Sequence, residues 1–301
     1  MKFSKQGLLA LNPPQRAAAE QIHGPVLILA GAGTGKTRTV TTRIAAMVHD
    51  EIPPSQILAV TFTNKAANEM RERVATMIEP EQAEQLTIST FHSLCVRILR
   101  TCIERLGYKR TFTIYTQSDQ LGLLRRIIVR LAGRDENLDA KLANTLISQA
   151  KNTGKPPSDR EEALINDVYR AYQKELKQLN AVDFDDLLIL AVRGLEENPD
   201  IRREWQRRYR FIMVDEFQDT NHLQMTLLRL IVGPEQNICV VGDDDQSIYG
   251  WRGADITNIL EFERHFSDPT VIKLEENYRS TNAILRLANS LIRHNLNRRE
   301  K

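Results

Sequence analysis

Cysteine is scarce in this chain. Its 301 residues include only Cys95, Cys102 and Cys239. An odd number without a closely spaced pair argues against both a disulfide framework and a zinc site. We therefore expect three reduced thiols in a cytoplasmic protein.

Long apolar runs are also lacking. No stretch approaches the ~18 consecutive apolar residues that a membrane helix needs, and the segment from Met1 to Ala10 lacks the apolar run of a secretory signal. We expect no membrane partner. The remaining composition, 42% hydrophobic and 27% charged, is typical of a globular protein with a sizeable core.

An excess of one charge is lacking too, because the net charge is only +2. Bulk charge therefore does not indicate a nucleic-acid partner. Locally the balance differs, since nine basic residues and two acidic ones lie between Arg97 and Arg134. Such a stretch could neutralise nucleic-acid phosphates or form the solvated face of a helix, and both interpretations stay open.

Short apolar runs that favour strands recur along the chain, and most precede a segment of helical periodicity such as Thr37–Val48 or Lys65–Met77. This alternation predicts an α/β fold with a parallel sheet and helices on both faces. Ligands of such sheets bind at the carboxyl ends of the strands. The predicted strands are Val26–Ala30, Ile57–Phe62, Leu86–Ser89, Phe211–Val214, Ile238–Val241 and Val271–Leu274.

The segment between the third and fourth predicted strands is long and almost entirely helical in pattern. From about Phe91 to Pro199 the periodicity predicts helices over Gln120–Leu131, Leu138–Ala150 and Glu161–Leu179. We infer an all-helical subdomain inserted into the α/β domain.

A phosphate-binding loop follows the first predicted strand. Residues Ala30–Thr37, AGAGTGKT, fit the pattern G-x-x-x-x-G-K-[ST] except that Ala30 replaces the first glycine. Backbone N–H groups of the glycine-rich turn and the following helix N-terminus would favour phosphate. Lys36 would reach the β and γ phosphates of ATP, and Thr37 would bind Mg²⁺.

Two carboxylates end the strand predicted at Phe211–Val214. Asp215 would bind Mg²⁺, and Glu216 would orient and deprotonate the attacking water. A strand that ends in Asp-Glu is weak evidence alone, because acidic residues often begin a helix. Together with a phosphate loop in the same chain it becomes strong.

Longer strings resemble motifs of the UvrD/Rep/PcrA group of superfamily 1A DNA helicases, in that family's order. Val214–Asn221 resembles the DExx box, and Val241–Ala254 resembles motif III almost letter for letter. Four shorter strings resemble the Q motif and motifs Ia, Ib and IV, respectively: Leu11–Ala18, Thr61–Ala67, Ser89–His92 and Asn277–Ser280. The resemblance runs from Leu11 to at least Asn297.

This resemblance implies a RecA-like P-loop NTPase that uses ATP and Mg²⁺. By position, Gln15 would contact the adenine edge, Tyr278 would stack on the base, Gln246 would sense the γ phosphate, and Arg279 would act as an arginine finger. The expected catalytic residues are Lys36, Asp215, Glu216, Gln246 and Arg279, with Thr37 and Asp215 as metal ligands. The expected nucleotide site comprises Gln15, Ala30, Gly31, Ala32, Gly33, Thr34, Gly35, Lys36, Thr37, Arg38, Tyr278 and Arg279.

The resemblance also implies a path for single-stranded DNA. Aromatic side chains would provide sequence-tolerant stacking surfaces there. Core packing is the alternative for each ring, above all for Phe62 and Phe91, whereas the neighbours of Trp251 favour an exposed loop. The expected DNA contacts are Phe62, Thr63, Asn64, Phe91, His92, Tyr249, Trp251 and Arg252. The implied partners are single-stranded DNA and single/double-strand junctions, in the nucleoid of a bacterial cytoplasm.

Two departures from the family pattern matter. The group usually has tyrosine at the position of Phe217, and phenylalanine there resembles the RecB/AddA helicase-nucleases. In addition, no string resembles motifs V and VI. We therefore expect the second RecA-like domain to be largely absent. The expected domains are a RecA-like ATP-binding domain at 1–90 and 200–272, a helical subdomain at 91–199, and the beginning of the second RecA-like domain at 273–301.

The leading functional hypothesis is a DNA-dependent ATPase, the motor portion of a helicase or translocase with 3′–5′ direction by resemblance. Its missing C-terminal half, or repair and replication proteins, would be further partners. One alternative is a truncated module that binds DNA and ATP without unwinding. A RecB/AddA-type motor fragment is another. A different P-loop enzyme, such as a nucleotide kinase, is disfavoured by motifs Ia and III.

Overall fold

The computed structural model describes residues 5–132, 138–154, 162–250 and 253–295. The chain divides into two compact units. We call the first the sheet unit, made of Met1–Phe91, Arg202–Asn221 and Leu228–Lys301, and the second the helical unit, made of His92–Ile201 and His222–Leu227. The predicted domain boundaries at residues 90, 199 and 272 stay predictions.

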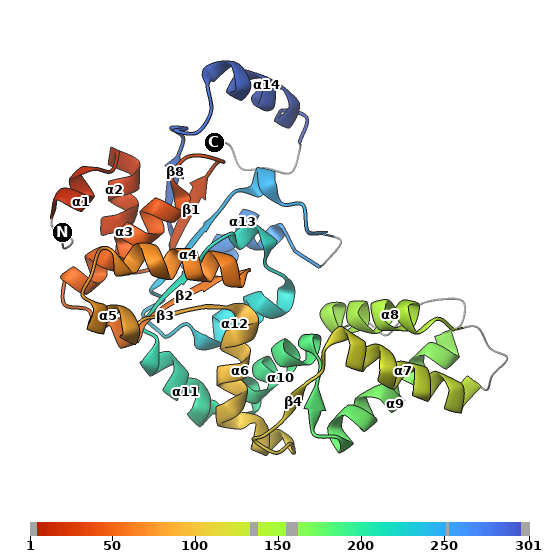
Figure 1. Ribbon diagram of the computed structural model, residues 1–301. Coiled ribbons are helices and arrows are strands. Elements are labelled where there is room, and N and C mark those ends of the chain that lie inside the picture. The colour runs from red at the N-terminus through yellow and green to blue at the C-terminus, as the bar shows by residue number, and fades with distance from the viewer. Residues whose placement is uncertain (1–4, 133–137, 155–161, 251–252, 296–301) are drawn as a thin grey trace. The chain divides into compact units, whose positions relative to one another are not determined.

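The sheet unit contains a six-stranded, fully parallel sheet in the order β3-β2-β6-β7-β1-β8 (Figure 1). The α/β fold predicted from the alternating pattern is therefore confirmed. Its strands are β1 Val26–Ala30, β2 Ile57–Thr61, β3 Thr87–Thr90, β6 Phe211–Val214, β7 Ile238–Gly242 and β8 Thr270–Leu274. Each begins and ends within two residues of the predicted range.

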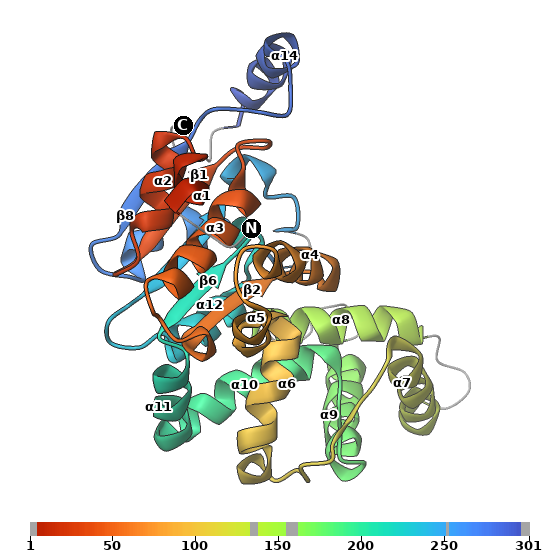
Figure 2. The same ribbon diagram turned by 60° about the vertical axis from the view of Figure 1, so that its left-hand side comes forward.

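Burial explains why these runs are so apolar. Every residue of β1, β2, β3, β6 and β7 is buried, as expected for a parallel sheet that helices cover on both faces. On one face, alternate strand residues such as Ile28 and Met213 pack with Ile44 of α3 (Lys36–His49) and Met70 of α4 (Asn64–Ala75). Helix α3 follows β1 directly, which is visible in Figure 2.

The parallel direction gathers the carboxyl ends of the strands at one edge of the sheet. At that edge β1 is followed by Gly31, β2 by Phe62, β6 by Asp215 and β7 by Asp243. Residues from remote parts of the sequence can therefore form one site.

The helical unit is built mainly from α6 Phe91–Cys102, α7 Gln117–Ala132, α8 Ala140–Thr153, α9 Glu162–Gln178 and α10 Phe184–Glu197. Leucine, isoleucine and valine side chains of α7, α8 and α9 form its core, together with the buried ring of Tyr172. The expectation of an all-helical insert needs one correction. A two-stranded parallel sheet joins β4 Thr113–Ile114 to β5 Ala181–Val182, and strands of two residues leave too short a pattern to be seen in the sequence.

A charged cluster is buried in the helical unit. The Nζ atom of Lys151 lies 2.5 Å from Oδ2 of Asp183 and 2.8 Å from Oδ1 of Asp186, and the lysine side chain has no exposed surface. Tyr172 donates its hydroxyl to the same Asp183 oxygen at 3.0 Å. Because Asp183 caps α10, this cluster fixes the beginning of that helix.

The remaining helices are short or lie at the margins of the two units. They are α1 Lys5–Leu9, α2 Pro13–Glu20, α5 Pro80–Gln85, α11 Pro199–Arg208, α12 His222–Ile231, α13 Thr257–Leu260 and α14 Asn282–Ile292. Among the residues that the structure describes, no helix is both long and apolar enough to cross a membrane.

Candidate functional site

The phosphate loop has the strand–turn–helix context that the sequence predicts. It joins β1 to α3, and Gly33 and Gly35 have φ angles of 75° and 84°. Side chains other than glycine rarely adopt such angles. A Cβ atom on Gly35 would also lie 2.7 Å from Nε2 of Gln15. The loop therefore needs these two glycines for both its backbone angles and its close contacts.

Ala30 replaces the first glycine of the motif without strain. It is the last residue of β1, is fully buried, and pairs with Leu274 of β8. Its φ angle is not positive, so the backbone at this position tolerates a methyl group. Its side chain belongs to the hydrophobic core.

Lys36 and Glu216 meet at the centre of the site. Nζ of Lys36 lies 3.2 Å from Oε2 of Glu216, with 11% of the lysine side chain and 41% of the glutamate side chain exposed. Glu216 also has a φ of 51°, in the left-handed region. Strain of this kind in a non-glycine residue often marks a functional position.

Asp215 and Asp219 are unusual carboxylates. Burial, followed by the charge of Glu216, raises the pKa of Asp215 to about 6, and the same two causes raise the pKa of Asp219 to about 6. The Oδ1 atom of Asp219 is buried and accepts no hydrogen bond from the described residues. The site thus holds more buried negative charge than its neighbouring Lys36 offsets.

These residues fit a magnesium ion. Asp215 offers carboxylate oxygens and Thr37 a hydroxyl, the hard oxygen donors that Mg²⁺ prefers. A cation there would favour the charged form of Asp215, which burial and the charge of Glu216 disfavour. The predicted ligands are therefore chemically suitable, and their role stays a proposal.

A chain of hydrogen bonds runs from Glu216 to Gln246. Gln218 donates Nε2 to Oε2 of Glu216 at 2.9 Å, and its Oε1 accepts from the backbone N–H of Asp243 at 3.0 Å. Gln246 in turn donates its side-chain N–H to Oδ2 of Asp243. This role of Gln218 was not predicted, because nothing in the local sequence indicates that its side chain bridges the strand ends of β6 and β7.

Tyr278 and Arg279 lie against the phosphate loop. The backbone N–H of Tyr278 donates to the carbonyl oxygen of Gly33 at 2.9 Å, and Asn277 donates its side-chain N–H to the carbonyl of Ala32. A Cβ atom on Gly33 would lie 2.6 Å from Cβ of Arg279. Both expected residues of motif IV are thus brought to the expected nucleotide site.

Gln15 and Arg38 complete the expected nucleotide residues. Gln15 is buried, and its Nε2 donates to the carbonyl of Thr34 at 2.9 Å. Thr34 donates its hydroxyl to the carbonyl of Gly31 at 2.8 Å. Arg38 is exposed and donates to the carbonyl of Ala10 at 3.0 Å.

The expected DNA residues of the sheet unit have different exposures. Tyr249 is 40% exposed, and Thr63 and Asn64 are exposed at the beginning of α4, where Thr63 caps the helix. Phe91 is only 1% exposed and packs edge-on against the half-buried Phe62, with ring centroids 5.5 Å apart. Phe91 is thus packed in the core of this structure, and its expected contact with DNA stays a prediction. Trp251 and Arg252 lie outside the described residues.

His92 lies in the helical unit and stacks on an aromatic ring that was not among the predicted site residues. The rings of His92 and Phe184 are 3.9 Å apart and inclined by 25°. Phe184 is 54% exposed, and burial lowers the pKa of His92 to about 4. The signal in the sequence was an aromatic residue at the first position of a helix, directly after the capping Asp183.

The basic stretch between Arg97 and Arg134 is partly used within the helical unit. Arg105 pairs with Asp200 at 2.8 Å, and Arg130 pairs with Glu175. Arg125 and Arg126 are exposed. Ion pairs within the unit therefore occupy Arg105 and Arg130, and both interpretations stay open for the exposed members of the stretch.

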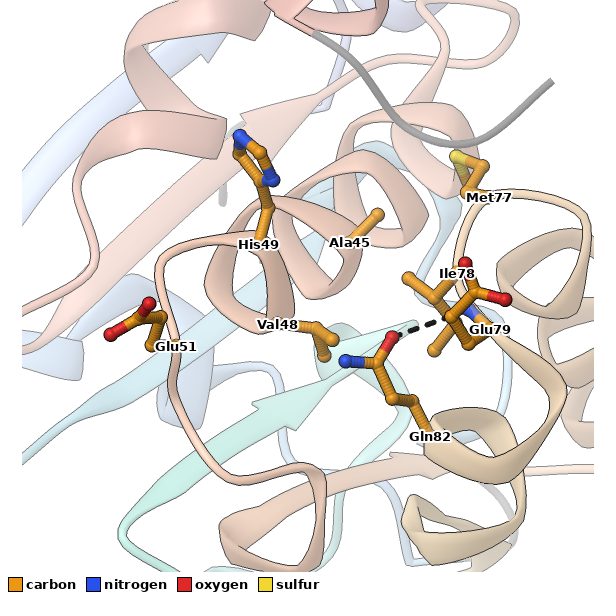
Figure 3. Close-up of a pocket in the computed structure, with 8 residues that line it drawn as sticks. All are labelled: Ala45, Val48, His49, Glu51, Met77, Ile78, Glu79 and Gln82. Carbon is orange, nitrogen blue, oxygen red and sulfur yellow. Dashed lines mark hydrogen bonds between the residues drawn. The ribbon is translucent and has the colours of Figure 1, made fainter.

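The sheet unit also has a cavity of about 330 Å³ that lies apart from the predicted site residues. It is lined by side chains around the ends of α3 and α4 and the start of α5, with Val48 and Ile78 in its apolar part (Figure 3). Gln82 accepts a hydrogen bond from the backbone of Glu79 there. None of the predicted site residues lines this cavity.

Comparison with known proteins decides the family. The family model described as the UvrD/REP helicase N-terminal domain matches residues 11–267. The chain belongs to this family. The resemblance that the motifs indicated is therefore confirmed, and with it the RecA-like sheet carrying a helical insert.

Two curated relatives of the UvrD/REP family show how much of such a protein the chain covers. The ATP-dependent DNA helicase PcrA of Bacillus subtilis is 46% identical over an alignment of 312 positions, gaps included, that covers 99% of this chain and 41% of that protein. PcrA of Staphylococcus aureus is 43% identical over an alignment of 304 positions, gaps included, that covers 97% of this chain and 41% of that protein. The chain thus spans about two fifths of the length of these relatives. Among solved structures, Pif1 helicase from Candida albicans matches with a TM-score of 0.43 and 11% identity, over 94% of this chain and 44% of that one.

Proposed function

We propose that this chain is the ATP-binding and single-stranded-DNA-binding portion of a 3′–5′ DNA helicase or translocase. The observation that carries the proposal is the continuous set of contacts from Lys36 through Glu216 and Gln218 to Asp243 and Gln246. It joins the phosphate loop to the motif III segment that the resemblance assigns to DNA. The names of the curated relatives, which are ATP-dependent DNA helicases, agree with it.

Each residue has a chemical role in this proposal. Lys36 binds the β and γ phosphate oxygens, and Thr37 with Asp215 holds Mg²⁺, which would offset the charge of those phosphates. Binding of the triphosphate would draw Lys36 toward phosphate and free Glu216 to take a proton from water. Gln15 and Tyr278 would contact the base, while Gln246 would sense the γ phosphate.

Arg279 indicates that hydrolysis by this chain alone is slow. Its side chain is exposed, and within the described residues its guanidinium has no hydrogen bond or ion pair. An arginine finger contributes about 10³–10⁵ in rate only when it is held in place. We therefore propose weak Mg-ATP hydrolysis and no duplex unwinding by the 301-residue chain. Contacts that hold Arg279 would come from the second half of the motor or from another protein.

The proposed DNA surfaces are described separately for the two units. In the sheet unit they comprise Phe62, Thr63, Asn64 and Tyr249, with Trp251 and Arg252 added by resemblance. In the helical unit they comprise the stacked pair of His92 and Phe184 and the exposed Arg125 and Arg126. Stacking is tolerant of base sequence, whereas arginine–phosphate contacts weaken with salt.

The test is an ATPase assay on the chain with and without single-stranded DNA, followed by strand displacement on a duplex with a 3′ tail. We expect slow hydrolysis that DNA stimulates, and no displacement. A chain that binds DNA but shows no hydrolysis above the Lys36→Ala variant would support the binding-module alternative. Robust unwinding would contradict the proposed dependence of Arg279 on further contacts.

A further inference from the structure

We propose that Asn12 is a positioning residue that sets the affinity of the nucleotide site for the base of ATP. It would do so by tethering the ring of Tyr278 over the site. This inference rests on the proposed function, because it names a determinant of base recognition in the same site. Neither the motif that contains Asn12 nor its place at a helix cap indicates this role.

Asn12 uses all the hydrogen-bonding groups of its side chain. Its Oδ1 accepts from the backbone N–H of Gln15 at 2.9 Å, which caps helix α2. Its Nδ2 donates to the hydroxyl of Tyr278 at 2.9 Å and to Oε2 of Glu276 at 3.1 Å. An amide is the side-chain group that offers an acceptor and two donors together.

The three residues form a closed triangle. Tyr278 donates its hydroxyl to the same Oε2 of Glu276 at 2.7 Å. Glu276 therefore receives two hydrogen bonds, and these contacts hold its pKa below the ordinary value. The triangle ties a segment near residue 278 to the first turn of α2, although 266 positions separate Asn12 from Tyr278.

Tyr278 is consequently fixed at both ends. Its backbone N–H is bonded to Gly33 of the phosphate loop, and its hydroxyl is held by Asn12 and Glu276. The ring between them is 58% exposed, so it has a free face for a base. A long side chain that is already ordered loses less conformational freedom when a ligand binds.

Asn12 connects both residues that are expected to contact the base. Its own backbone N–H donates to Oε1 of Gln15 at 3.2 Å, and Nε2 of Gln15 holds the carbonyl of Thr34 in the phosphate loop. The same asparagine therefore orients Gln15 from one side and Tyr278 from the other. Serine or aspartate would cap the helix as well, but neither has an N–H to donate to Tyr278.

This difference provides a variant that removes the hydrogen bond from residue 12 to Tyr278 and still caps helix α2. Asn12→Ser keeps a good helix cap and removes the amide group whose N–H atoms reach Tyr278 and Glu276, since the serine side chain is shorter and has no amide. Tyr278→Phe keeps the ring and removes the hydroxyl. Binding of a non-hydrolysable ATP analogue and of tripolyphosphate, which has no base, is measured with Mg²⁺ on the 301-residue chain. Melting temperature reports on the fold.

We expect each single variant to bind the ATP analogue about two- to tenfold more weakly, the range set by ordering one long side chain. The double variant should show no further loss, because both changes break the same tether. Affinity for tripolyphosphate and the melting temperature should stay at the parental values. Asn12→Ala, which removes the cap as well, should lower the melting temperature.

Three results would overturn the inference. Parental analogue affinity in Asn12→Ser means that the tether does not matter. Equal losses for the analogue and tripolyphosphate mean that Asn12 acts on the phosphate loop in general, and additive losses in the double variant mean two separate effects. If the parent chain binds neither ligand, the proposed function itself fails and the inference fails with it.

Discussion

Lys36 and Glu216 form an ion pair of 3.2 Å across 180 positions of the sequence. The cation that is expected to bind phosphate thus neutralises the carboxylate that is expected to activate water. Competition between phosphate and Glu216 for the same ammonium group follows from this contact. The first two predictions test the two members of the pair.

Replacing Lys36 with alanine should abolish ATP hydrolysis. The lysine is 11% exposed, and we propose that it neutralises the β and γ phosphate oxygens. Turnover is measured by phosphate release with and without single-stranded DNA. Lys65→Ala is the matched control, because that lysine is 87% exposed on α4. If the Lys36→Ala variant hydrolysed ATP at the rate of the parent chain, the assignment of residues 30–37 as a phosphate loop would be wrong.

Replacing Glu216 with glutamine should separate nucleotide binding from chemistry. The amide can still accept from Gln218, but it cannot take a proton, so the rate should fall by about 10²–10⁴. Affinity for an ATP analogue should persist, because Asp215 and Lys36 remain. Titration calorimetry and single-turnover hydrolysis measure the two quantities. Loss of binding together with activity would show that Glu216 has a structural role.

Replacing Phe184 with alanine should weaken single-stranded DNA binding. Its ring is 54% exposed and stacks on His92, so we expect a loss of about 1–3 kcal/mol, the value of one base stack. The loss should be similar for different base sequences in a fluorescence anisotropy titration. Val129→Ala, at an exposed apolar position of α7 in the same unit, is the control. Equal effects of the two variants would leave Phe184 without a DNA role.

The half-buried ring of His92 predicts a pH dependence of stability. Its pKa is lowered to about 4 by burial, against about 6.5 in an unfolded chain. The unfolded chain therefore binds the proton first. The contribution of neutral His92 to the free energy of unfolding is fully present above about pH 6.5. It is lost as the pH falls toward 4, and the loss is roughly 3 kcal/mol at most.

The measurement is the melting temperature between pH 7.5 and 5. His92→Phe retains an aromatic ring but cannot be protonated, so its melting temperature should fall less on acidification than that of the parent chain. An NMR titration of the imidazole gives the pKa directly. An identical fall in both proteins, or an imidazole that titrates near pH 6.5, would refute this account of His92.

Replacing Lys151 with methionine should destabilise the helical unit. The change leaves Asp183 and Asp186 buried without their cation, and breaking such a pair costs about 3–5 kcal/mol. Thermal unfolding followed by circular dichroism measures the effect, with the exposed Lys174→Met as control. Adding Asp183→Asn and Asp186→Asn should recover part of the loss, because the amides carry no charge and asparagine still caps α10. No recovery would indicate that packing dominates at Lys151.

The sequence by itself determined the family, the parallel sheet and the nucleotide motifs. Residues Ala30–Thr37 and the pair Asp215–Glu216 are contiguous strings at the ends of apolar runs, and their roles follow from local order. Parallel strands place their carboxyl ends at one edge, so the approach of Lys36 to Glu216 could be anticipated. The five helix ranges predicted from the sequence begin and end within three residues of α3, α4, α7, α8 and α9, because apolar periodicity is a local signal.

Only the tertiary structure decided which individual side chains are accessible and which contact one another. It buried Phe91, exposed Phe184 beside His92, placed Gln218 between Glu216 and Asp243, and connected Asn12 to Tyr278. The local sequence around a phenylalanine or an asparagine does not differ between a buried position and an exposed one. The outcome depends on contacts between residues far apart in the chain, and these contacts exist only once each unit has folded.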